Sequence, residues 1–470
     1  MGGQGEGGGR VWRGRKSLTL VIVRVAGNGE LCGNQNRYVM DMKVLPKLFV
    51  FCCLSLCAAT AAQGQDDTSA RPSRLTIGGY GEAVYSRHFY SDNVFRYTYP
   101  DRYTENSGYG RVDLPHAVIM LGYDFGHGWS MGTEVEFEHG GVEAAVEKET
   151  EETGEFEQEV ERGGEVALEQ FWLQKSFGKA FNIRAGHIVV PVGMTNNGHL
   201  PTQFFTVYRP EGENTIMPCT WHETGLSLWG RAGAWRYEVQ LLPGLNSNLF
   251  NASGWVHNGS ASPYEFRPAN SLAGAVRVDW TGVRGLRLSL SGYAGNSFAN
   301  DIVTEQYPET SKYYGARGTV LIGCFDFAFQ NKYFMVRGNA DYGYLTDAAL
   351  ISTRNKNQTT MTGNPYQHTP VGQHAYDLAH EVGLDLLAWS PTSQRLYLFG
   401  RVDRYDSFLP AEGFADIEWT GRTVYTAGVN WFPLPEVCIK AEYGYRQLKA
   451  QYNPEPWVAV GVTWAGFCGN

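Results

Sequence analysis

The stretch Trp457-Val-Ala-Val-Gly-Val-Thr-Trp464 decides the fold class, because large apolar residues alternate with small ones along it. From Val458 onward, the even positions carry Val or Trp and the odd positions carry Ala, Gly or Thr. A period of two places these two sets on opposite faces of a β-strand. The same alternation recurs at 235–241, 286–291 and 437–446. The chain is therefore predicted to be all-β.

The connections between these segments distinguish a membrane barrel from a soluble sandwich, which alternation alone does not do. Short connections take turns with long ones along the chain. The short ones lie at 126–128, 178–180, 231–234, 281–284, 323–325, 390–394 and 433–436. The long ones lie at 90–112, 139–165, 190–221, 244–270, 296–312, 346–378 and 406–421, with a shorter link at 450–455. Short periplasmic turns that alternate with long external loops are typical of a bacterial outer-membrane barrel.

Counting between these breaks predicts a transmembrane, antiparallel, up-and-down β-barrel of about 16 strands over residues 75–470, with both termini periplasmic. The expected strands are 75–89, 113–125, 129–138, 166–177, 181–189, 222–231, 235–243, 271–281, 285–295, 313–323, 325–345, 379–389, 394–405, 422–432, 436–449 and 456–467. Strand 325–345 needs a bulge near Tyr333 to Val336, because its polar positions change from even to odd there. A barrel of this size encloses an aqueous lumen.

The N-terminal residues divide into two pieces. Residues 42–64 read as a secretory signal peptide, with Lys43 and Lys47 before an apolar core at 48–56 and small residues at 58–62. We expect cleavage between Ala61 and Gln65, and a short periplasmic segment at 65–74. Residues 1–41 are interpreted as a non-native extension, with translation starting at Met42.

Charge and cysteine content exclude several function classes. The first 65 residues carry eight Lys and Arg against three Asp and Glu, which leaves 31 basic and 45 acidic residues and a net charge of −14. Such a chain is not expected to bind nucleic acid, which needs a basic face. The mature cysteines form no CxxC pair, so we expect no metal site and no cofactor. Whether Cys438 and Cys468 are bonded stays open, because the predicted registers place them on opposite faces.

Two further features concern the surface. Eight tryptophans lie near predicted short turns, where aromatic rings favour the membrane interface, although packing in a soluble core is the alternative. They are Trp129, Trp172, Trp229, Trp235, Trp280, Trp389, Trp431 and Trp464. Residues 143–165 contain ten glutamates. They are interpreted as a solvated external loop rather than a calcium site.

Several segments resemble porins related to the phosphate-selective porin O and P family. Residues 191–211 and 220–229 are similar to the long third-loop region of those porins, and Ile77-Gly-Gly-Tyr-Gly-Glu82 and residues 115–125 resemble them too. The resemblance suits a Bacteroidetes member, and it implies a 16-stranded pore, a homotrimer and an inward-folded loop that narrows the channel. Phosphate selectivity in that family depends on a lysine cluster. Between Pro191 and Trp221 this chain has no lysine, so the resemblance does not extend to phosphate.

Charged residues predict where a channel would sort its solutes. The long connection 190–221 is the expected constriction loop. Its charged residues serve in selectivity or, alternatively, in ion pairs that fix the loop to the wall. The constriction candidates are Arg209, Glu211, Glu213, His222 and Glu223. With apolar positions facing lipid, the expected lumen-lining residues are Glu134, Glu136, Arg184, Arg236, Arg277, Arg287, Arg337, Arg401, Lys440 and Arg446. Both signs of charge are present, so no ion preference follows.

These observations predict an outer-membrane porin that forms a water-filled channel for passive diffusion of small hydrophilic solutes or ions. The expected partners are outer-membrane lipids and the barrel-assembly machinery. The alternative is a barrel with an occluded lumen that serves as a surface binding or structural protein. An enzyme is not expected, since the sequence has no HExxH motif and its 11 histidines are scattered.

Overall fold

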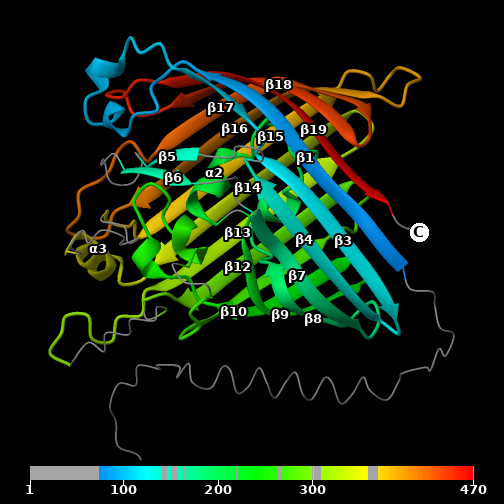
Figure 1. The fold of residues 1–470 in the computed structure, drawn as a ribbon, viewed down its shortest axis with the longest axis horizontal. Helices are drawn as coiled ribbons and strands as arrows, with labels where there is room; N and C mark the ends of the chain where they lie inside the picture. Colours follow the sequence, from blue (N-terminus) through cyan, green and yellow to red (C-terminus); the bar gives the residue numbers. More distant parts are fainter. Residues whose placement is uncertain are drawn as a thin grey trace, which may run out of the picture. The chain divides into compact units, whose positions relative to one another are not determined.

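The computed structural model describes residues 74–139, 145–149, 157–161, 166–218, 220–262, 266–298, 300, 309–357 and 369–468. The expected extension 1–41, the signal peptide 42–64 and residues 65–73 lie outside the described residues. The described part forms a closed antiparallel barrel whose strands are strongly tilted (Figure 1).

The wall follows the chain order, and each strand pairs antiparallel with the next. Its strands are β1 (Arg74–His88), β2 (Tyr109–Asp113), β3 (His116–Gly126), β4 (Trp129–Glu138), β7 (Val166–Ser176), β8 (Asn182–Val189), β9 (His222–Ala232), β10 (Trp235–Pro243), β11 (Leu272–Trp280), β12 (Leu286–Asn296), β13 (Thr319–Gln330), β14 (Phe334–Leu345), β15 (His374–Asp385), β16 (Arg395–Leu409), β17 (Arg422–Leu434), β18 (Val437–Gln447) and β19 (Glu455–Cys468). β1 pairs with β19 from Ile77–Cys468 to His88–Trp457, which closes the sheet.

β2 and β3 are two segments of one wall strand, because both pair with β1. Pro115 lies at the break between them, and proline has no N–H to donate to the ladder. Counting them as one gives the 16-stranded barrel that the sequence predicts, and this prediction is confirmed.

Alternation along each strand produces an apolar outer face and a polar inner face. In β15, Ala375, Asp377 and Glu381 are buried, whereas Leu378 and Val382 are about half exposed. An apolar face on the outside of a closed barrel is the surface that contacts lipid in the outer membrane. The chain is thus an outer-membrane β-barrel.

One predicted hairpin was misplaced. β13 continues through residues 323–325, which were expected to form a short turn, and ends at Gln330. The turn lies at 331–333, where the Asn331 side chain accepts hydrogen bonds from the backbone N–H groups of Tyr333 and Phe334. The predicted bulge near Tyr333 to Val336 is therefore wrong. The inward-facing polar residues change from even to odd numbers there because β13 ends and β14 begins, and the three-residue turn between them resets the alternation.

The described tryptophans divide between the two faces. Trp129, Trp235, Trp389, Trp431 and Trp464 are large exposed side chains, as expected for an interface belt. Trp172 and Trp229 instead lie against Arg184, whose guanidinium carbon is 4.6 Å and 5.6 Å from their ring centroids. These two rings therefore lie on the inner side of the wall and not at the membrane interface.

Cys438 lies on β18 and Cys468 on the neighbouring strand β19, out of register with each other. β18 places Cys438 opposite Thr463, whereas Cys468 is opposite Ile77 on β1. Cys438 is a buried free thiol in the structure. The registers therefore keep these two positions apart.

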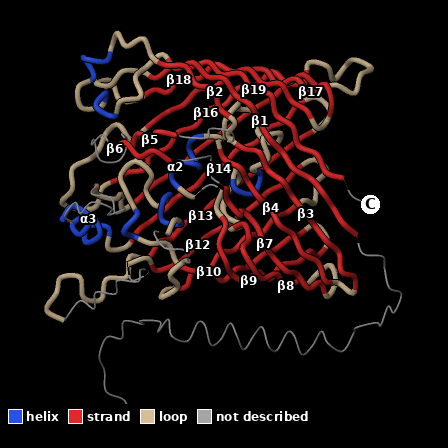
Figure 2. Tube along the Cα trace, in the orientation of Figure 1, coloured by secondary structure: helices blue, strands red, loops and turns tan. Residues whose placement is uncertain are grey.

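Helices occur in the connections and not in the wall (Figure 2). The long connections and α3 gather at the end of the barrel opposite the C-terminus (Figure 1), and we call this the long-loop end and the other the short-turn end. The helices are η2 (Val94–Arg96), η3 (Pro100–Tyr103), η4 (Asn196–Gly198), α2 (Glu211–Ile216), η5 (Ser247–Leu249), η6 (His257–Ser260) and α3 (Ala348–Asn357). None of the described helices has the length and hydropathy needed to cross a membrane.

The glutamate-rich connection contains a hairpin. β5 (Ala145–Glu149) pairs with β6 (Glu157–Glu161), which the sequence did not predict. The remaining residues between 140 and 165 lie outside the described part of the chain.

Candidate channel interior

Loop 190–221 folds into the barrel and reaches the opposite wall. Lys440 Nζ on β18 donates to the carbonyl oxygens of Phe204 and Thr206 at 2.9 Å and 2.8 Å. Asn430 on β17 donates to the Phe205 carbonyl at 2.9 Å. The loop backbone is the donor in one further bond, from Val207 N–H to a carboxylate oxygen of Glu442 on β18 at 2.7 Å. β17 and β18 therefore hold the tip of the loop across the interior.

Asn196 closes the base of the loop. Its side-chain amide donates to the Val190 carbonyl at 2.7 Å and its oxygen accepts from Trp221 N–H at 2.6 Å. The two ends of the loop are also joined by the bond from Val190 N–H to the Trp221 carbonyl at 2.8 Å. Both ends thus leave the wall at one point.

Glu213 on α2 binds the first turn of the same loop. Its carboxylate accepts backbone N–H bonds from Met194 and Thr195 at 2.9 Å, and from Asn196 at 3.2 Å. Burial raises the pKa of Glu213 above its ordinary value, and these backbone donors oppose the rise. Gly193 permits the approach, because its φ is +80° and a Cβ there would lie 2.2 Å from the carboxylate.

Glu211 connects α2 to the long-loop end of β16, β17 and β18. Arg446 donates to its two oxygens at 2.8 Å and 2.7 Å, Arg422 lies 3.4 Å away, and the Tyr405 hydroxyl donates as well. Burial alone would raise the pKa of Glu211, but the two guanidinium groups outweigh it and hold the pKa below its ordinary value.

An apolar cluster fills the interior on the side of β10 to β15. The loop 190–221 contributes Val192 and Trp221, the connection after β10 contributes Phe250 and Trp255, and α3 contributes Ile351; all are buried. Trp255 packs directly on the wall at Gly343, where a Cβ would lie 2.0 Å from its ring. Sixteen strands alone therefore do not give an open lumen here, because connections occupy part of it.

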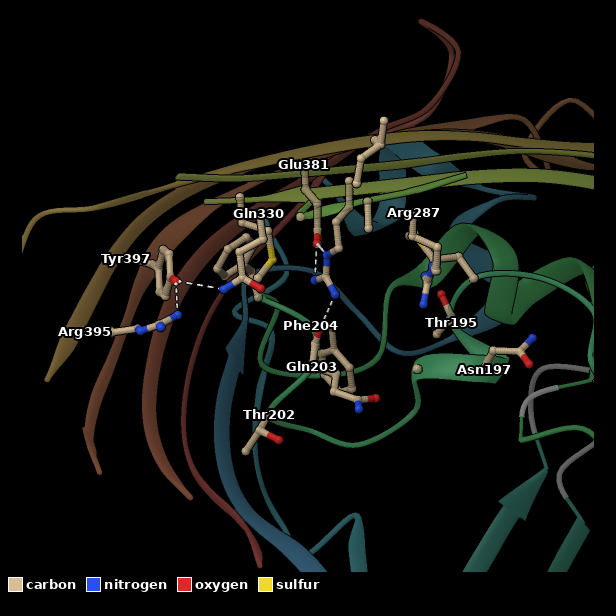
Figure 3. A pocket seen from close by; sticks show the side chains of 18 of the residues that line it. Thr195, Asn197, Thr202, Gln203, Phe204, Arg287, Gln330, Glu381, Arg395 and Tyr397 are labelled. Carbon is tan, nitrogen blue, oxygen red and sulfur yellow. Dashed lines mark hydrogen bonds and ion pairs between the residues drawn. The ribbon is translucent and has the colours of Figure 1, made fainter. Parts of the chain in front are cut away.

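Two cavities lie on opposite sides of loop 190–221. The larger, of about 830 Å³, reaches the short turns at 281–285 and 393–395 and is bounded by loop residues such as Gln203 and Phe204 (Figure 3). The smaller, of about 400 Å³, lies among the long connections and is bounded by Asn214 and Thr215 of the loop. The two cavities share no lining residue.

Arginine dominates the charged lining of both cavities. The larger cavity is lined by Glu381 and by five arginines: Arg284, Arg287, Arg337, Arg395 and Arg401. The smaller cavity is lined by Asp92 and by three arginines: Arg96, Arg422 and Arg446. Figure 3 shows Arg287 and Arg395 on the wall beside the larger cavity.

The five constriction candidates occupy the loop region but line neither cavity. Glu211 and Glu213 make the contacts described above. Arg209 donates to the Thr220 hydroxyl at 3.0 Å, and Glu223 pairs with Arg267 at 2.8 Å. His222 Nδ1 is 3.0 Å from His187 Nε2. These contacts favour the alternative that the sequence left open, in which the charges fix the loop to the wall.

The ten lumen candidates all lie on the inner side, in different surroundings. Arg287, Arg337, Arg401 and Arg446 line a cavity. Arg236 pairs with Glu238 and Asp279, and Arg277 with Asp279 and Asp326. Arg184 packs against tryptophans, Lys440 holds the loop, and Glu134 and Glu136 are buried on β4.

Sequence reasoning missed several residues around these sites. Arg284 and Arg395 lie at short turns, where face alternation gives no direction. Arg96 lies in a connection and pairs with Glu455 at 2.6 Å. Because the two residues are far apart in the sequence, no local pattern predicts this pair. Glu169 was missed because a bulge in β7 displaces it from simple alternation.

Comparison with known proteins gives one relative and several similar folds. The chain is 25% identical over 397 residues to an uncharacterized protein of Aquifex aeolicus (strain VF5), covering 83% of this chain and 79% of that protein. No family model matches the chain, and membership of the phosphate-selective porin O and P family is therefore not shown.

The structural neighbours are outer-membrane porins and channels. The anion-selective porin from Comamonas acidovorans has a TM-score of 0.47 and 10% identity, covering 84% of this chain and 100% of that one. OmpF of Salmonella typhi, in complex with daunomycin, has a TM-score of 0.48 and 8% identity, covering 85% and 99%. The channel DcaP of Acinetobacter baumannii has a TM-score of 0.46 and 11% identity, covering 84% and 97%. At these values the likeness carries no conclusion about solutes.

Proposed function

We propose that this barrel is a porin for passive diffusion of small hydrophilic solutes, with a preference for anions. The observation that supports this most is the arginine-rich lining of two cavities on opposite sides of one inward loop. Solutes would enter at one end, pass loop 190–221 as the constriction, and leave at the other. Rings of basic side chains favour anions in pores of this kind.

The larger cavity gives the stronger electrostatic argument. Arg337 and Arg401 both contact Glu381, and Arg287 pairs with Asp326 at 3.3 Å. Arg395 donates to the Tyr397 hydroxyl at 3.1 Å, which carries no charge. Arg401 also pairs with Asp403 at 2.5 Å. The five arginines therefore contact three carboxylates, Glu381, Asp326 and Asp403, and an excess of positive charge remains at the short-turn end.

Reversal potentials in planar bilayers test the proposal. Purified protein should give stepwise conductance, and a salt gradient should show anion preference. The double variant Arg284→Glu with Arg395→Glu should shift the reversal potential toward cations, because it reverses two of the cavity's positive charges. Arg231→Glu is the matched control, since Arg231 lies at the short-turn end of β9 but lines neither cavity. Cation preference of the unmodified protein would overturn the anion assignment.

A second function is favoured by the apolar cluster inside the barrel. Connections fill the side of β10 to β15, and the two cavities share no lining residue, which suits a surface binding or structural protein with an occluded lumen. Absence of conductance from correctly folded protein would favour this function over the channel.

A further inference from the structure

Two carboxylates of the wall and one imidazole of the inward loop meet on the inner side of β4 and β7. One ligand atom each from Glu134 (β4), Glu169 (β7) and His199 (loop 190–221) lies within 4.8 Å of the others. Both carboxylates are 1% exposed. His199 Nε2 is 3.7 Å from Glu134 Oε1, and His222 Nε2 is 3.7 Å from Glu169 Oε1.

A β-bulge brings the second carboxylate into this group. β4 and β7 shift register between Glu134, which pairs with Gln170, and Val135, which pairs with Leu168. Glu169 is the extra residue at this shift. A bulge redirects a side chain that regular alternation would place elsewhere, and here both Glu169 and Gln170 contact inner-face groups. The wall therefore departs from regular pairing at the point where it adds a buried acid.

Hydrogen bonds satisfy only part of this group. Glu169 accepts from the Tyr80 hydroxyl at 3.2 Å and from the Thr220 hydroxyl at 2.7 Å. Glu134 Oε2 accepts from Gln170. Glu134 Oε1 is buried and receives no hydrogen bond from the described residues. A buried carboxylate oxygen without a donor is costly, and a cation bound between this oxygen and His199 would satisfy it.

Further carboxylates lie close by, and the charge of the Arg209 guanidinium acts on Glu82 and Glu136 and offsets part of theirs. Glu82 and Glu136 are also buried on the inner wall, at 6% and 1% exposure, and His116 contacts both. Several ionised carboxylates in one buried region require protons, paired cations or a metal ion. A divalent ion bound between Glu134 and Glu169 would offset two of these charges at once.

We propose that Glu134, Glu169 and His199 form a divalent metal site of the zinc class, with His222 as a further imidazole ligand. One or two imidazoles with two carboxylates are a donor set that Zn²⁺ and similar ions accept. Ligand bonds of about 2.0–2.2 Å require the donor atoms of Glu134 and His199 to close in by a few tenths of an ångström. Because His199 belongs to the loop and the carboxylates to the wall, the ion would join the constriction loop to β4 and β7.

Zinc titration of the whole purified protein in detergent, after removal of metals with a chelator, tests the site. Calorimetry should give one tight Zn²⁺ per chain for the unmodified protein. Glu134→Gln and His199→Ala should each weaken that binding by more than about tenfold, because loss of even an outer-shell partner costs about 10–100-fold in affinity. Zn²⁺ should also raise the unfolding temperature of the unmodified protein, and it should raise that of the two variants less at the same Zn²⁺ concentration.

The matched control is Glu238→Gln, which changes a buried inner carboxylate bound by Ser227 and Arg236 instead. It should retain the tight Zn²⁺. Folding of each variant is checked by heat-dependent migration in gels, and His199→Ala keeps the test valid if a wall variant does not fold. If the unmodified protein binds no Zn²⁺ tightly, the proposal is overturned and the carboxylates of the cluster share protons instead. If Glu134→Gln and His199→Ala bind Zn²⁺ as tightly as the unmodified protein does, the proposal is also overturned, and the zinc binds adventitiously at the surface.

Discussion

Several buried charged residues in this barrel hold loop 190–221 in place through hydrogen bonds and ion pairs. Glu213 accepts hydrogen bonds from backbone N–H groups of the loop, and Lys440 donates hydrogen bonds to carbonyl oxygens of the same loop. Glu211 draws guanidinium groups from two strands onto α2. Each of these side chains satisfies several partners at once, which suits a buried polar group in a medium of low dielectric.

The carboxylate of Glu211 should make stability depend on pH. Its folded-state pKa lies below its ordinary value of 4.5, so its contribution is present above that value and is lost as the pH falls through the lowered folded pKa. Glu211→Gln should cost about 1.5–3 kcal/mol near neutral pH, as expected for hydrogen bonds to charged groups. The variant should also lose less stability on acidification than the unmodified protein, measured by thermal unfolding across a pH series. An equal loss in both proteins would contradict the assigned role.

The elements divide into a wall that follows the chain and connections that occupy its interior. β17 and β18 hold loop 190–221 from the far side, and Trp255 from the connection after β10 packs on β14 at Gly343. Contacts of this kind decide how much of the lumen stays open. The strand count alone does not decide it.

Releasing the loop tip should change conduction if the channel proposal holds. Lys440→Gln removes the cation that binds the Phe204 and Thr206 carbonyls, so the loop should move more freely. We expect larger or more variable single-channel conductance in planar bilayers and greater cleavage of the loop by added protease. Lys332→Gln serves as the control, because Lys332 lies in the turn between β13 and β14, with its ammonium 5.7 Å from the centroid of the Tyr333 ring. Unchanged conductance and cleavage in Lys440→Gln would contradict this role.

In the whole molecule, the outer and inner faces of the barrel wall differ in polarity. Exposed aliphatic and aromatic side chains recur on the outer face of most wall strands, and lipid or other subunits must cover them. The inner face carries the arginine-lined cavities and the proposed metal site. One barrel therefore presents an apolar surface to its surroundings and a polar inner face of the wall to its interior.

We expect three copies of this barrel to associate, as the sequence resemblance to porins related to the phosphate-selective porin O and P family implies. Part of the apolar outer face would then pack between subunits and be withdrawn from lipid. Native mass spectrometry of protein extracted in mild detergent should give the mass of three chains, and heating should convert it to one. A single chain under all extraction conditions would contradict this expectation.

The sequence by itself determined the wall of this protein, because a period of two and the unequal connections are local signals that survive without any tertiary contact. It placed strands such as 129–138 and 235–243 within the observed bounds. It failed at 323–333, where a parity change read as a bulge was a turn. Only the tertiary structure decided what fills the barrel: the partners of Glu211, Lys440 and Glu134 lie far away in sequence, on loops whose paths follow from packing and buried charge and not from any local pattern.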